Sequence, residues 1–151
     1  MVQGKWFAPG QPLGEVLPVR EAVFGAAGPE SDPLSWNCLV FWDGVPAAAG
    51  RIWWQDGASR IGDSGVLPAY RGRGLGDLAL RLLLFKAQSH AAREVRLKTP
   101  PELAGFFARL GFRAGAPEEG GAETLEMMIP GDAIDLDTCR NCPRQDCPSR
   151  K

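Results

Sequence analysis

Hydrophobic residues follow helical spacing in three stretches of the chain. Leucines crowd residues 75–84 with no period of two, which predicts a largely buried helix over 74–90. Apolar positions from 13 to 24 predict an earlier helix, with Pro18 either at a bend or in the first turn. A third helix is predicted to open at Pro100-Pro101, because proline is tolerated in a first helical turn.

Strands are predicted where β-branched and aromatic residues gather or alternate with polar ones. The segments 36–42, 45–55 and 60–66 are separated by Asp43-Gly44 and Asp56-Gly57, two strong hairpin signals, so they form an antiparallel meander. The strand predicted at 94–98 follows a helix and can therefore lie parallel to the strand ending at Val66. Two shorter strands are predicted around 5–7 and over 124–129.

Composition narrows the class of protein. A chain of 151 residues with 44% hydrophobic and 23% charged residues is expected to form a globular domain with its own core. The net charge of −1 gives no basis for binding nucleic acid or an anionic membrane surface. No apolar run approaches the roughly 18–20 residues of a membrane span, and the first residues lack an apolar signal core. We therefore expect a cytoplasmic protein.

The segment from Arg71 to Gly76 joins a predicted strand to a predicted helix. It contains glycines at alternate positions (Gly72, Gly74 and Gly76) and two arginines. The first N–H groups of a helix have no internal partner and carry partial positive charge, so this segment predicts an anion site, most naturally for phosphate. A dinucleotide-binding fingerprint would need glycine at position 77, where the chain has Asp77. A P-loop would need a lysine that this segment does not contain.

What remains is Arg-x-x-Gly-x-Gly, preceded by Val66-Leu67-Pro68, and this resembles the acetyl-CoA-binding motif of the GNAT acetyltransferase superfamily. The segment 107–112, Phe-Ala-Arg-Leu-Gly-Phe, resembles the family's Tyr-x-x-Leu-Gly-Phe signature. The resemblance covers roughly residues 12–130. It implies an α/β fold with a mixed, partly open sheet flanked by helices on both faces. We accordingly expect a GNAT domain over 1–130 and a Cys-rich tail over 131–151.

The resemblance also implies a function: transfer of an acetyl group from acetyl-CoA to an amine by direct attack. The acceptor would be an unidentified amine on a small molecule or peptide, and a homodimer is conceivable. By the same resemblance, Val66 and Leu67 would bind the pantetheine arm as an extra strand. Gly62 and Gly65 either permit a bulge there or mark a weak strand. The pyrophosphate would be held by the loop residues Arg71, Gly72, Arg73, Gly74, Leu75 and Gly76.

Catalytic groups are harder to assign. Phe107 stands where the family's usual general acid, a tyrosine, would be, and phenylalanine cannot donate a proton. The one candidate base is Asp63, which is otherwise a solvated strand carboxylate, and a water chain could serve instead. Tyr70 and His90 suit packing and helix capping better than catalysis. The alternative function is a catalytically weak, CoA-binding GNAT-like module with a metal- or redox-sensing Cys tail.

The tail carries three of the four cysteines: Cys139, Cys142 and Cys147. Thiolates at this spacing suit zinc or an iron–sulfur cluster, but a fourth ligand is missing nearby and Cys38 is expected in the core. A redox disulfide and loose thiols are the other options. Four tryptophans between 36 and 54 either wall an apolar acceptor pocket or fill the core between strands.

Overall fold

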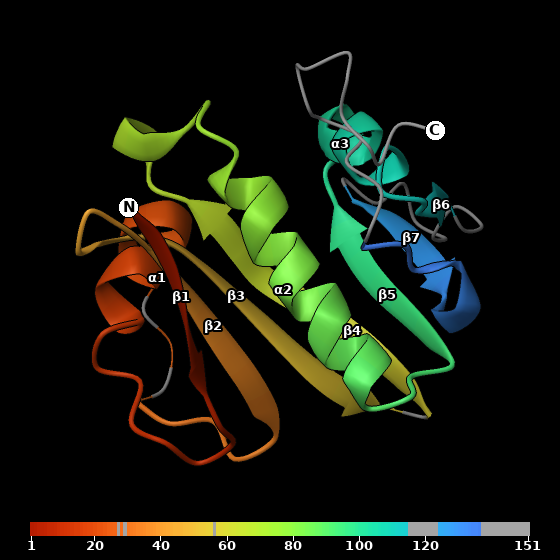
Figure 1. Ribbon diagram of the computed structural model, residues 1–151, viewed down its shortest axis with the longest axis horizontal. Helices are drawn as coiled ribbons and strands as arrows, with labels where there is room; N and C mark the ends of the chain where they lie inside the picture. Colours follow the sequence, from red (N-terminus) through yellow and green to blue (C-terminus); the bar gives the residue numbers. More distant parts are fainter. Residues whose placement is uncertain (27, 29, 56, 115–123, 137–151) are drawn as a thin grey trace.

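A computed structural model describes residues 1–136 apart from 27, 29, 56 and 115–123; the side chain of Asp63 is also outside the description. In this part of the chain seven strands form one sheet in the order β1-β2-β3-β4-β5-β7-β6 (Figure 1). β4 and β5 are parallel and the remaining neighbours are antiparallel, which confirms the predicted mixed sheet. The strands are β1 (Val2–Phe7), β2 (Ser35–Trp42), β3 (Val45–Gln55), β4 (Ala58–Val66), β5 (Glu94–Thr99), β6 (Arg113–Ala114) and β7 (Leu125–Pro130).

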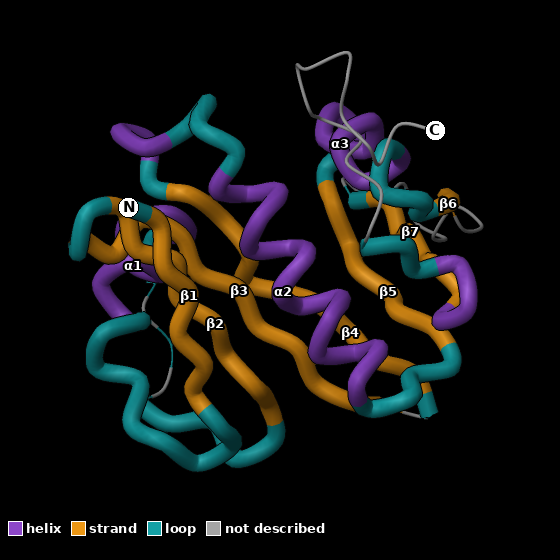
Figure 2. The backbone as a smooth tube through the Cα atoms, in the orientation of Figure 1, coloured by secondary structure: helices purple, strands orange, loops and turns teal. Residues whose placement is uncertain are grey.

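Helices cover both faces of the sheet, as predicted. The longest, α2 (Leu75–Ser89), crosses one face, while α1 (Leu17–Phe24) lies on the other (Figures 1 and 2). Pro18 occupies the first turn of α1, which decides between the two positions considered for it. The segment after Pro100 opens as a 3₁₀ turn (Pro101–Leu103) and continues into the short helix α3 (Ala104–Ala108). None of the described helices is long and apolar enough to span a membrane.

Two layers of core result from this arrangement. On one face, the leucines of α2 pack against β-branched and leucine side chains of β3, β4, β5 and β7. On the other face, α1 and the loop before it pack against β1, β2 and β3. Burial of such side chains contributes about 25 cal/mol per Å² and is the main stabilising term. The fully buried members on the α2 face include Ile52, Leu80, Leu83, Leu84, Val95 and Ile129.

The beginning of the predicted tail contacts this core. After β7, a 3₁₀ turn (Gly131–Ala133) leads to Ile134, whose side chain is buried. The N–H of Gly131 donates to the carbonyl of Arg93 over 2.8 Å, and Gln88 donates to the carbonyl of Ile134 over 3.4 Å. Residues 131–136 therefore pack against the domain, whereas Cys139, Cys142 and Cys147 lie outside the described residues.

Candidate active site

The parallel strands β4 and β5 stay together over only three residue pairs. Ser59, Arg60 and Ile61 pair with Val95, Arg96 and Leu97. Beyond these pairs β4 continues beside β3 to Val66, and β5 continues beside β7 to Thr99. From Gly62 onward β4 therefore presents backbone groups toward a strand that has moved away. Such an edge can accept an extended ligand as an additional strand.

A β-bulge in β4 coincides with this parting. Arg51 of β3 pairs with Gly62 and Ala49 pairs with Gly65, so two residues of β4 stand opposite the single Gly50. A bulge bends its strand and increases the local twist. Between the two explanations for the glycines, the structure thus favours the bulge. Asp63 lies in the bulge, but its side chain is outside the description, so its role as a base stays a prediction.

After β4 the chain makes a 3₁₀ turn (Pro68–Tyr70) and reaches α2 through a glycine-rich loop. Gly72 and Gly74 have φ angles of +80° and +79°, and a β-carbon on either would meet nothing within 4 Å. Gly74 is also the N-cap of α2, so no side chain caps the helix. The first N–H groups of α2 therefore receive no hydrogen bond from a capping side chain and carry partial positive charge, as a backbone anion site requires.

Both arginines of the glycine-rich loop make contacts that hold them in place. Arg71 donates from Nε to the carbonyl of Val66 over 3.1 Å, which ties the loop to the end of β4. The guanidinium of Arg73 lies 4.8 Å from the ring centroid of Trp42 and 5.3 Å from that of Tyr70. Tyr70 therefore acts in packing, as expected, and both arginines are held within the loop that leads into α2.

The helix α3 closes toward the same loop. A β-carbon on Gly76 would lie 3.4 Å from Val66 and 3.8 Å from the ring of Phe106, so the start of α2, the end of β4 and α3 meet there. Phe107 is half-buried and makes edge-on contacts with Phe106 and Phe112 at centroid distances of 5.1 and 6.0 Å. The position of the expected general acid thus holds only carbon atoms.

A pocket of about 610 Å³ lies where β4 and β5 part. Ile61 and Leu97 contribute to the α2-side core, so their neighbours Gly62 and Lys98 point to the opposite face, because side chains alternate along a strand. Gly62 has no side chain to fill the space just beyond the last β4–β5 pair, Ile61 with Leu97. The lining residues are Trp53, Gln55, Arg60, Ile61, Gly62, Leu97, Lys98 and Glu126.

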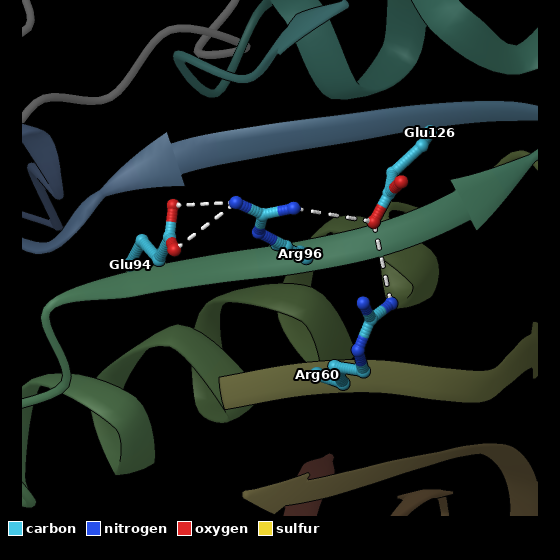
Figure 3. Close-up of polar contacts among 4 residues, drawn as sticks. All are labelled: Arg60, Glu94, Arg96 and Glu126. Carbon is cyan, nitrogen blue, oxygen red and sulfur yellow. Dashed lines mark hydrogen bonds and ion pairs between the residues drawn. The ribbon is translucent and has the colours of Figure 1, made fainter. Parts of the chain in front are cut away.

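Charged side chains from three strands form a row beside this pocket (Figure 3). Glu126 of β7 accepts a hydrogen bond from Arg60 of β4 over 3.3 Å and lies 3.8 Å from Arg96 of β5. Arg96 in turn donates to both carboxylate oxygens of Glu94, over 3.2 and 3.4 Å. The row Glu94–Arg96–Glu126–Arg60 therefore fixes the direction of the two groups that reach the pocket, Glu126 and Arg60.

A second ion pair supports the tryptophan wall of the pocket. Arg51 donates from Nε to Asp32 over 2.5 Å, and its guanidinium lies 4.3 Å from the ring centroid of Trp53. Burial alone would raise the pKa of Asp32. Hydrogen bonds from Arg51 and the N–H of Leu34, together with the Arg51 charge, outweigh this effect and lower that pKa below its ordinary value. Asp32 is therefore ionised at neutral pH and anchors Arg51 against the tryptophan.

Other sequence candidates lie away from the pocket. Trp36 and Trp54 pack with His90 at the end of α2, and His90 takes the C-cap position expected for it. Burial raises the pKa of Cys38 to about 12, as suits a core thiol. Of the four tryptophans considered as an acceptor wall, only Trp53 lines the pocket. The described residues form no metal-binding group of three or more His, Cys, Asp or Glu side chains.

Sequence analysis did not identify Arg60 or Glu126 as site residues. Side chains alternate along a strand, so residues two positions apart lie on the same face. This alternation alone could have placed Arg60 on the same face as Gly62. The pairing of Glu126 with Arg60 depends on the registers of β4, β5 and β7, which connect residues 66 positions apart.

Comparison with known proteins agrees with this geometry. A family model described as the acetyltransferase (GNAT) family matches residues 10–112. No curated protein is similar enough in sequence to count as a match.

Many solved structures share the fold. The chain is 16% identical to the ribosomal-protein-S18-alanine N-acetyltransferase of Escherichia coli, with a TM-score of 0.70 over 86% of this chain and 94% of the other. It is 22% identical to Escherichia coli ElaA, with a TM-score of 0.69 over 85% of this chain and 99% of the other. An acyl-CoA N-acyltransferase from Pseudomonas aeruginosa is 23% identical, with a TM-score of 0.67 over 83% of this chain and 99% of the other.

Proposed function

Because this chain belongs to the GNAT acetyltransferase family, we propose that it is an N-acyltransferase that uses acetyl-CoA and acts on an amine of a small molecule or peptide. One observation carries the proposal most: β4 parts from β5 after Ile61 and then leads, through a 3₁₀ turn, into a glycine loop that ends in an uncapped helix N-terminus. An extended arm followed by a pyrophosphate needs this combination of a strand edge and an anion site.

The residues present suit coenzyme A. The backbone of Val66 and Leu67 would hold the pantetheine arm along β4, and the N–H groups from Arg71 to Gly76 would hold the pyrophosphate. The open space around Gly72 and Gly74 leaves room for phosphate oxygens to approach those N–H groups closely. The charges of Arg71 and Arg73 would add charge-assisted hydrogen bonds, each contributing roughly 1.5–3 kcal/mol.

When bound, acetyl-CoA supplies an acetyl thioester, whose transfer to an ammonium group gives an N-acetyl amide, the free CoA thiol and one proton. Phe107 cannot protonate the leaving sulfur, and the described pocket lining contains no Tyr, Cys or His. A thiolate leaves readily, so the reaction does not depend on a general acid. We assign the proton acceptor to Asp63 or to water, and the geometry of the pocket supplies the positioning.

The test is a mass-spectrometric search for acetylated products. The full chain is incubated with acetyl-CoA and a panel of small amines and peptides, and CoA release is followed in parallel. We expect at least one amine to gain one acetyl group, with one CoA released for each product. If acetyl-CoA binds but no amine is acetylated, the proposal fails and the alternative of a CoA-binding module without transfer is supported.

A further inference from the structure

We propose that the acceptor is a small amine with a carboxylate close to its amino group, as in an amino acid, and that Arg60 and Glu126 bind these two groups. The proposal rests on the proposed acyltransferase function and assigns its acceptor class. Both side chains line the 610 Å³ pocket at the point where β4 and β5 part, a volume typical of small-ligand sites.

Glu126 has one oxygen held and one oxygen turned away from the arginines. Arg60 and Arg96 both approach it through Oε1, at 3.3 and 3.8 Å. Figure 3 shows Oε2 directed away from both guanidinium groups. The arginines therefore hold the carboxylate through one oxygen and make no contact with the other, which we assign to the ammonium group of the acceptor.

Arg60 is fixed in the same way and keeps hydrogen-bond donors. Its contact with Glu126 uses Nη1, and a guanidinium carries five N–H donors. A planar guanidinium binds carboxylates through two parallel hydrogen bonds, which a lysine ammonium cannot reproduce. Because Arg60 and Glu126 touch each other, their ligands must lie close together, as the ammonium and carboxylate of an amino acid do.

The row behind these groups keeps them oriented before a ligand arrives. Arg96 is held by Glu94 and approaches the same oxygen of Glu126 as Arg60 does, from another direction (Figure 3). Trp53, with Arg51 stacked on it, forms an apolar wall suited to the side chain of the acceptor. Preorganised charges of this kind position an amine without a reorganisation cost.

The test compares free amino acids with matched amines that lack the carboxylate. Phenylalanine, leucine and glutamate are assayed with acetyl-CoA beside their amides and decarboxylated amines. We expect at least one amino acid to have a kcat/KM about tenfold or more above both counterparts, the loss typical of a charge-assisted hydrogen bond. Arg60→Gln should reduce that ratio to within about threefold, and Arg60→Lys should restore it only in part. Arg113→Gln, an exposed arginine on β6, controls for the lost charge.

The outcomes separate this proposal from the acyltransferase function. Equal or faster acetylation of amides, decarboxylated amines or peptide N-termini would overturn the carboxylate assignment and leave the acyltransferase function standing. If no amine is acetylated, calorimetry of the same amino acids with the CoA-bound protein decides. Binding that weakens about tenfold or more in Arg60→Gln would support the site, and absence of binding by wild type would overturn it.

Discussion

At the scale of single residues, the chemistry of the site depends on what is missing as much as on what is present. At Phe107, where the family resemblance led us to expect a tyrosine acid, the chain has a ring that packs against Phe106 and Phe112. Gly62 leaves a pocket open that any side chain would fill, since its β-carbon would lie 2.9 Å from Trp53. What the described residues offer a substrate is therefore shape, backbone N–H groups and fixed charges.

Phe107→Tyr tests whether a general acid matters. The side chain is half-buried, so a hydroxyl should be tolerated with a change in unfolding free energy within about 1 kcal/mol. If the reaction proceeds without an acid because thiolate leaves readily, kcat should stay the same or rise. Steady-state kinetics with the best acceptor from the panel would measure this. A loss of more than about tenfold in a stable variant would show that Phe107 positions a substrate.

At the scale of elements, the sequence predicted what is encoded locally. The glycine-rich loop, the leucine-rich α2 and the two Asp-Gly hairpins each lie within a few consecutive residues, and the structure contains all three. β6 has only two residues and no alternating pattern, so it could not be predicted from the sequence. The pairing of Arg60 with Glu126 was not predictable either, because it depends on how β4, β5 and β7 align across the sheet.

The contact between α2 and β3 gives a prediction at this scale. A β-carbon on Gly50 would lie 2.7 Å from Cδ1 of Leu83 and 3.3 Å from Sγ of Cys38, both fully buried. Gly50→Ala should therefore lower the unfolding free energy by about 1–3 kcal/mol through overpacking. In Gly105→Ala, the added carbon meets nothing within 4 Å on α3, so this control should be neutral or up to about 1 kcal/mol more stable. Urea denaturation measures the unfolding free energies of both variants. Equal values for Gly50→Ala and Gly105→Ala would contradict the packing described.

At the scale of the whole molecule, the structure separates two parts of the predicted tail. Residues 131–136 carry the buried Ile134, whereas 137–151 lie outside the described residues. Truncation after Leu136 should leave the melting temperature and acetyl-CoA affinity within error of wild type. Truncation after Pro130 removes Ile134 from the core and should cost about 2–4 kcal/mol, or roughly 10 °C in melting temperature. Calorimetric melting of both truncations measures this.

A similar melting temperature for the two truncations would contradict the packing of Ile134. A loss of stability or acetyl-CoA affinity after Leu136 would instead show that 137–151 contribute to the domain. Elemental analysis of protein purified without oxygen then tests Cys139, Cys142 and Cys147 for zinc or iron. Less than about a tenth of an equivalent would end the metal hypothesis, and thiol titration would separate a disulfide from free cysteines.

The central claim is that the loop between β4 and α2 binds acetyl-CoA. Its most direct test is calorimetric titration of acetyl-CoA into wild type, Gly74→Asp and Gly10→Asp. Both glycines are exposed, have φ near +80°, and would place a β-carbon in open space, so the two variants carry the same charge and similar backbone strain. Only Gly74→Asp puts a carboxylate at the N-cap of α2, where the pyrophosphate would bind.

We predict that Gly74→Asp binds acetyl-CoA at least about thirtyfold more weakly than wild type, while the affinity of Gly10→Asp stays within about threefold of wild type. Unchanged affinity in a folded Gly74→Asp variant would contradict the account.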